Sequence, residues 1–160
     1  MNIGIIFYSR TGNTKHAANI IKEKLELKNE KVDLIEIQHE KKPGFFKASR
    51  AALKGNELPI SNTDFNLKKY DKLIIGAPTW AGNPSPYIMT FFNKAKNYKD
   101  KPAAVFYTCG GKTSKTSMVE KLKDYLDSKG LQLSGKNLGL QMGKGIIIAG
   151  EDEIDDFIKK

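Results

Sequence analysis

Short apolar runs alternate with amphipathic stretches along the whole chain, and this alternation limits the fold more than any other feature. The pair of patterns repeats about five times. Strands are predicted at 2–8, 31–37, 73–76, 103–107 and, least regularly, within 131–142. Helices are predicted at 14–28, 45–54, from Pro86 (with Ser85 as N-cap) past Ala95, from Ser114 or the capping-box Ser117 to Gly130, and at 151–160. This α/β order predicts a parallel sheet with helices on both faces and right-handed crossovers.

The length and composition of the chain bound its class. At 160 residues it is expected to form a single domain, 1–160. It starts directly in a candidate strand rather than in a signal segment, and no apolar run approaches the roughly 20 residues that cross a bilayer. Cys109 is the only cysteine, which excludes an internal disulfide and fits a reducing compartment. We therefore expect a soluble, cytoplasmic protein.

The formal net charge of +9 has two interpretations. A basic chain can bind nucleic acid or an acidic partner. However, the lysines are spread along the whole chain and form only short clusters such as Lys41-Lys42. Solvated helix faces therefore explain the charge better than a nucleic-acid site does.

In sheets of this kind the ligand lies beyond the carboxyl ends of the strands, where three loops of this chain meet: 9–14, 77–84 and 108–114. The first loop follows a strand and opens a helix, so its N–H groups and the positive helix end form a cradle for one phosphate. Hydroxyls of Ser9, Thr11 and Thr14 add donors, and Gly12 permits a conformation that a β-carbon would hinder. The alternative is a capped turn that binds nothing.

The other two loops suit a flat ligand. The second carries the only tryptophan, Trp80, which either stacks on an aromatic ring or caps the core. The third, Thr108 to Thr113, offers backbone N–H groups to a polar ring edge. Cys109 in this loop is read as a small buried residue rather than a nucleophile, because no histidine lies nearby in sequence to act as its base.

These three motifs, in this order, resemble those of the flavodoxin family, and the similarity spans essentially the whole chain. Ser9-x-Thr11-Gly12-Asn13-Thr14 is similar to the family's phosphate loop, Gly76-Ala77-Pro78-Thr79-Trp80 to its first flavin-ring loop and Thr108-Cys109-Gly110-Gly111 to its second. The resemblance implies a three-layer α/β/α sandwich with five parallel strands in the order 2-1-3-4-5. It also implies FMN, held by Ser9, Arg10, Thr11, Gly12, Asn13, Thr14, Pro78, Thr79, Trp80, Ala81, Gly82, Asn83, Thr108, Cys109, Gly110 and Gly111. Flavodoxins are often strongly acidic around the flavin, whereas this chain is basic.

The resemblance leaves two uses of FMN open. The first, which the sequence favours, is a carrier that passes electrons between redox protein partners. If the basic surface governs the choice of partner, these proteins are acidic. The second is an oxidoreductase that reduces quinones or similar acceptors with NAD(P)H. In both, the flavin carries the chemistry and no catalytic side chain is required. A basic nucleic-acid-binding module without flavin is the weakest alternative, because it rests on charge alone.

Other ligand classes are excluded by particular positions. Gly111-Lys112-Thr113 resembles the end of a P-loop, but Phe106 stands where that motif needs its upstream glycine. Gly143-x-Gly145 is followed by Ile148 where a dinucleotide fingerprint has its third glycine. No set of cysteines and histidines has the spacing of a metal site.

Overall fold

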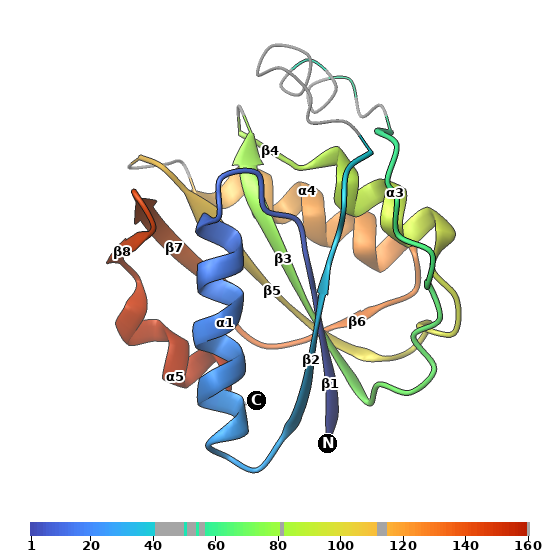
Figure 1. The fold of residues 1–160 in the computed structure, drawn as a ribbon, viewed down its shortest axis with the longest axis horizontal. Coiled ribbons are helices and arrows are strands. Elements are labelled where there is room, and N and C mark those ends of the chain that lie inside the picture. Colours follow the sequence, from blue (N-terminus) through green and yellow to red (C-terminus); the bar gives the residue numbers. More distant parts are fainter. Residues whose placement is uncertain (41–49, 51–53, 55–56, 81, 112–114, 160) are drawn as a thin grey trace.

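A central twisted sheet with helices on both faces forms the body of the molecule (Figure 1). The computed structural model describes residues 1–159 except 41–49, 51–53, 55–56, 81 and 112–114. The strands are β1 (Asn2–Phe7), β2 (Lys31–Glu36), β3 (Lys72–Trp80), β4 (Asn83–Pro84), β5 (Pro102–Cys109), β6 (Gln132–Leu133), β7 (Leu138–Gly143) and β8 (Ile146–Ala149). The helices are α1 (Asn13–Glu26), α3 (Pro86–Lys94), α4 (Lys115–Ser128), the 3-10 turn η1 (Glu151–Glu153) and α5 (Ile154–Phe157).

The order of the parallel strands is as predicted. The sheet runs β2-β1-β3-β5-β7-β8, and its first five strands are parallel to one another. Numbered along the chain, these five read 2-1-3-4-5. The structure adds β8, which is antiparallel to β7 at the end of the sheet, and two short strands, β4 paired with β3 and β6 paired with β5.

Alternate residues of the strands build two hydrophobic clusters, one on each face of the sheet. In β1, Ile3, Ile5 and Phe7 face the cluster that includes α1 and α5, whereas Ile6 faces the cluster that includes α3 and α4. Close packing within the sheet also restricts residue size at Gly76. A β-carbon at Gly76 would lie 2.2 Å from Cζ of Phe106, so the Phe106 ring occupies the space that a larger residue would need.

Several predicted boundaries are wrong. The segment predicted as a loop at 77–84 instead continues β3 to Trp80 and returns through β4, and β5 runs on to Cys109. Within 131–142, Gly135 lies in the break between β6 and β7, but Gly139 lies inside β7. The predicted helix at 151–160 is shorter, with a 3-10 turn before α5.

One predicted helix start is confirmed and another needs correction. Ser85 is the N-cap of α3 and Pro86 is its first residue, as predicted, although the Ser85 side chain makes no capping hydrogen bond. Ser117 lies inside α4, which already contains Lys115, so it does not begin a capping box. The predicted helix 45–54 lies outside the described residues, apart from Arg50 and Lys54, which are helical.

Candidate functional site

The first loop wraps around the N-terminus of α1. Gly12 is the N-cap with a φ of 91°, a left-handed conformation that favours glycine, and its carbonyl accepts a 2.9 Å hydrogen bond from the His16 N–H. The Ser9 Oγ accepts a 3.2 Å hydrogen bond from the Lys15 N–H. The loop is therefore shaped by the helix end, where backbone N–H groups and the helix dipole favour an anion.

The first and third loops are joined by a buried contact. The Thr14 and Thr108 hydroxyl oxygens lie 2.8 Å apart, and the two residues are 1% and 3% exposed. This hydrogen bond connects the first turn of α1 to the end of β5. Thr14 is predicted to contact a phosphate, and in the structure its hydroxyl also has a protein partner at the cavity wall.

All three loops meet in one cavity of about 220 Å³ at the carboxyl ends of the parallel strands. The prediction that the three loops meet beyond the carboxyl ends of the strands is therefore confirmed. The lining residues are Arg10, Thr11, Asn13, Thr14, Pro78, Thr79, Trp80, Thr108, Cys109 and Gly110. Each of them was predicted to bind the cofactor.

The other predicted residues that the structure describes are not among those that line this cavity. Gly82 follows β3 with a φ of 73°, and Gly111 is exposed. The Asn83 Oδ1 accepts a 2.6 Å hydrogen bond from the Lys121 Nζ, which directs this side chain toward α4. Ala81 lies outside the described residues.

Cys109 lines the cavity but is nine-tenths buried, at 6% exposure. Its thiol donates to the Gly111 carbonyl at 3.4 Å and lies 3.7 Å from the Leu140 carbonyl. The position of Cys109 agrees with its interpretation as a small buried residue.

Trp80 belongs to the cavity and to the core at once. Its ring lines the cavity and also packs edge-on against Tyr8, with centroids 5.6 Å apart, and against Tyr87, at 6.2 Å. Tyr8 and Tyr87 stack on each other at 4.3 Å and are fully buried. One edge of Trp80 is therefore held by the core while the side chain also lines the cavity, and its stacking on a ligand ring stays a prediction.

Sequence reasoning missed this aromatic cluster, which also includes His39. The His39 ring lies 5.9 Å from Tyr8, and its Nδ1 is 3.4 Å from the Tyr8 hydroxyl. Tyr8, His39 and Tyr87 come from three separate segments, so no local pattern connects them. Tyr8 immediately precedes the first loop and Tyr87 follows Pro86, and only the packed sheet brings them under Trp80.

Burial holds the two tyrosine hydroxyls in their neutral form. It raises the pKa of Tyr8 far above its ordinary value, with a contribution from Tyr87, while the Arg10 cation opposes the shift. Burial also raises the pKa of Tyr87, and Arg10 again opposes it. Arg10 thus lies close enough to the aromatic cluster to influence both hydroxyls.

The donors of the cavity fit a phosphorylated ligand with a flat ring. The Thr79 Oγ1 is buried in the cavity wall and has no hydrogen-bond partner among the residues that the structure describes. The helix end, the Thr11 hydroxyl and the Arg10 cation suit a phosphate, and Trp80 suits a ring. In the described part of the chain, no group of three or more His, Cys, Asp or Glu residues could hold a metal ion.

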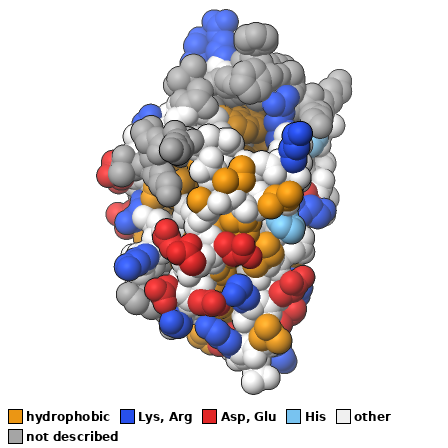
Figure 2. Space-filling model, turned by 90° about the vertical axis from the view of Figure 1, so that its left-hand side faces the viewer, with side chains coloured by type: hydrophobic (Ala, Val, Ile, Leu, Met, Phe, Trp, Pro, Cys, Tyr) orange, Lys and Arg blue, Asp and Glu red, His pale blue; other side chains and the backbone are white. Residues whose placement is uncertain are grey.

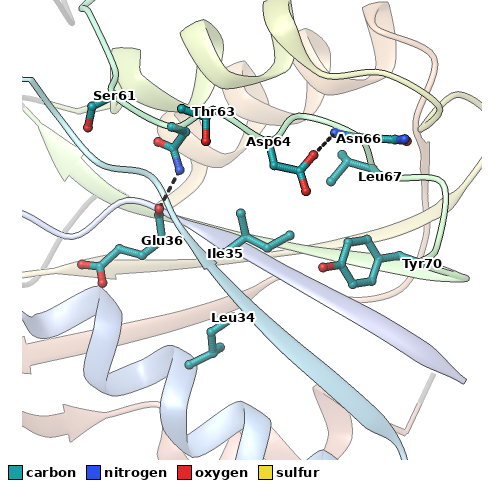
Figure 3. Close-up of a pocket in the computed structure, with 10 residues that line it drawn as sticks. Leu34, Ile35, Glu36, Ser61, Thr63, Asp64, Asn66, Leu67 and Tyr70 are labelled. Atoms are coloured by element: carbon teal, nitrogen blue, oxygen red, sulfur yellow. Dashed lines mark hydrogen bonds between the residues drawn. The ribbon is translucent and has the colours of Figure 1, made fainter.

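A second cavity, of about 350 Å³, lies along β2 and away from the three loops (Figure 3). Asn62 mimics a strand residue there: its Nδ2 donates to the Glu36 carbonyl at 3.0 Å, and its Oδ1 accepts from the Gln38 N–H at 2.8 Å. The Asp64 side chain in this cavity accepts from the Asn66 N–H within its own turn. These polar groups therefore serve the edge of β2 and the turn beside it, and none comes from the three loops.

Comparisons with known proteins point to flavoproteins. The family model described as NADPH-dependent FMN reductase matches residues 1–142. A flavoprotein from Lactobacillus acidophilus NCFM, solved in complex with FMN, is 27% identical, with 98% of this chain and 97% of that chain covered and a TM-score of 0.69. Flavodoxin 1 from Bacillus cereus is 19% identical, with 99% and 93% covered and a TM-score of 0.63. No curated protein matches the chain. The likeness to the flavodoxin confirms the expected fold.

Proposed function

The chain belongs to the family of NADPH-dependent FMN reductases, and from that premise we propose that it is an oxidoreductase that uses NAD(P)H and bound FMN to reduce a quinone or similar acceptor. The family match carries this proposal, because it covers residues 1–142 and so includes all three loops. It favours the second of the two uses of FMN that the sequence left open. The cofactor, FMN, is the one that both the resemblance and the family imply.

In this proposal each loop has one task toward the cofactor. The N–H groups of the loop from Ser9 to Thr14 and the Thr11 hydroxyl hold the phosphate, with Arg10 adding a positive charge. Trp80 contacts one face of the ring, and its orientation is held by Tyr8 and Tyr87. The backbone from Thr108 to Gly111 meets the polar edge of the ring. The Thr79 hydroxyl, buried in the cavity wall, is available to a ligand atom.

The charge of the cavity supports a dinucleotide as electron donor. Of the described residues that line it, Arg10 is the one charged side chain, and no carboxylate is among them. NAD(P)H carries negatively charged phosphates, so a chain of net charge +9 attracts it. When bound, FMN supplies the chemistry by accepting a hydride and passing electrons on. The chain binds and orients the ring, and the buried tyrosines exclude water beneath Trp80.

The proposed function is accompanied by proposals for the domain organisation and the cellular location of the protein. Both hydrophobic clusters pack on one sheet, so we propose that residues 1–160 form a single FMN-binding domain. Cys109 fits a reducing compartment, and we propose the cytoplasm. Within the described ranges, no helix is long and apolar enough to cross a membrane.

A carrier between redox proteins is the second candidate, supported by the flavodoxin-like fold and the charge of +9. Stopped-flow reduction of the FMN-loaded protein separates the two. An NAD(P)H-dependent oxidoreductase is reduced directly by NADPH or NADH and reoxidised by a quinone. A carrier is reduced only when a reductase is added, and its reaction with an acidic partner slows as salt rises. Direct reduction that is too slow to sustain turnover would reject the oxidoreductase.

A further inference from the structure

One end of the sheet exposes an apolar edge strand. β8 is the outermost strand beyond β7, and its Ile146 and Ile148 are 66% and 60% exposed. Figure 2 faces this side of the molecule and shows hydrophobic side chains gathered at its centre, with acidic side chains below them. An outer strand also presents backbone N–H and C=O groups along its free edge. This edge therefore offers both hydrogen bonds and apolar contact to another strand.

Most edge strands carry features that prevent such pairing, and the two ends of this sheet differ in that respect. At β2, the Asn62 amide bonds to the outer backbone groups of Glu36 and Gln38. The four residues of β8, by contrast, are Ile146, Ile147, Ile148 and Ala149, with neither a charge nor a proline among them. A bulge at Ile148 interrupts the ladder with β7, which shortens the regular edge that another strand can use.

The charges that flank β8 indicate which strand it would pair with. Lys144, exposed in the turn before β8, stands at one end, and the exposed acids Glu151, Asp152 and Glu153 of η1 stand at the other. β8 thus has a basic residue before its first residue and acidic residues after its last, so antiparallel pairing of two copies brings the basic end of each strand toward the acidic end of the other. The edge is thus complementary in charge to itself.

We propose that a second copy of this chain docks on β8, giving a weak dimer with two-fold symmetry in which the two sheets join through their β8 strands. Such a contact is self-complementary, as a two-fold interface must be. Ile146 and Ile148 supply its apolar centre, and Lys144 with Glu151 supplies its two symmetric ion pairs. The strand is short, so the interface is small and the dimer is concentration-dependent.

The dimer contact lies beside the site. The turn before β8 is attached to α1, because the Gly145 N–H donates to the Asn13 Oδ1 at 3.2 Å. Asn13 lines the cavity proposed for FMN. The docked copy therefore sits next to the phosphate loop, although the pairing itself does not depend on the proposed activity.

Sedimentation of the FMN-loaded chain over a range of concentrations tests the contact. We expect the average mass to rise from 17.9 kDa toward twice that value as concentration increases. The double variant Ile146→Lys/Ile148→Lys should raise the dimer Kd by about tenfold or more. Leu27→Lys is the matched control, since Leu27 is 84% exposed at the end of α1 and outside the contact. A wild type that stays monomeric, or a control that weakens the dimer equally, overturns the proposal.

Charge reversal tests the antiparallel arrangement. Lys144→Glu and Glu151→Lys should each weaken self-association, because each homodimer then places like charges opposite one another. An equimolar mixture of the two variants should recover dimers, since both cross-pairs become attractive. Circular dichroism confirms that each variant is folded. A mixture that remains monomeric would overturn this geometry even if the wild type dimerises.

Discussion

The side-chain hydroxyl of Thr14 lies 2.8 Å from that of Thr108, although 94 residues separate them in the sequence. One belongs to the first turn of α1 and the other to the end of β5, and both are almost fully buried. The distance between the phosphate-loop helix and the third loop is therefore maintained by a hydrogen bond under the cavity.

Replacing both of these hydroxyls should cost less stability than the sum of the losses caused by replacing each one alone. In Thr108→Val the Thr14 hydroxyl is left buried without its partner, so we expect the free energy of unfolding to fall by about 1–3 kcal/mol. The double variant Thr14→Val/Thr108→Val should cost less than the sum of the single changes, because the two residues interact directly. Urea denaturation measures both, with Thr108→Ser as the control that keeps the hydroxyl. Strictly additive losses would show that the bond contributes nothing.

The Thr11 hydroxyl should matter for the phosphate and not for the ring. Thr11→Ala should weaken FMN binding by roughly 1.5–3 kcal/mol, the value of a hydrogen bond to a charged group, and leave riboflavin binding nearly unchanged. Titration of the apo-protein with each ligand measures the difference. Thr63→Ala, the same change in the cavity along β2, should affect neither ligand. If wild-type protein binds FMN and riboflavin equally well, the loop does not hold a phosphate.

Trp80 should report the ring directly, because it is the only tryptophan. Binding of FMN should quench its fluorescence, and removal of FMN should restore it. Tyr87→Leu removes one of the two rings that hold Trp80 edge-on, so the quenching should become weaker or more heterogeneous. An emission spectrum that FMN leaves unchanged would return Trp80 to a purely structural role.

Alkaline pH should destabilise the protein through its tyrosines. Burial is the first cause that raises the pKa of all six: Tyr8, Tyr70, Tyr87, Tyr98, Tyr107 and Tyr125. The unfolded chain ionises its tyrosines near a pKa of about 10. The folded protein holds these protons more tightly, so stability is intact below that pH and falls as pH rises toward the folded values.

Tyrosinate absorbance followed together with circular dichroism checks this prediction. In the folded protein, ionisation should be delayed until the fold is lost, whereas in denaturant it should occur near the ordinary value. A tyrosine that ionises at its ordinary pKa while the circular dichroism stays native would contradict the burial seen at that residue.

The strand order and the grouping of the three loops were predictable because both depend on simple repeating rules. Buried parallel strands appear as short apolar runs, and the carboxyl ends of parallel strands share one edge. The end of β3 was missed because 77–84 is rich in residues that favour turns, Pro78 among them, and the whole segment was predicted as a loop. In the structure Pro78 pairs with Thr108 of β5 and the strand continues, so a proline near a strand end did not mark a loop.

Two further features depend on contacts that no local pattern contains. The turn before β8 has positive φ at Lys144 and Gly145, 50° and 81°. The strand that follows has only four residues, too few to show a clear alternation of apolar and polar positions. The packing of Tyr8, His39 and Tyr87 beneath Trp80 joins residues that are up to 79 positions apart. The phosphate loop, by contrast, is contiguous, and its helix start was visible in the sequence.

The side chain of Asn62 covers one end of the β2 edge. It occupies the Glu36 carbonyl and the Gln38 N–H, so a further strand cannot form hydrogen bonds with these two groups. At the opposite end of the sheet, a two-fold contact between two β8 strands uses the β8 edge of both molecules. Assembly through β8 alone therefore ends at a pair, and a longer fibre would also need a contact at β2, where Asn62 obstructs the carboxyl end of the strand.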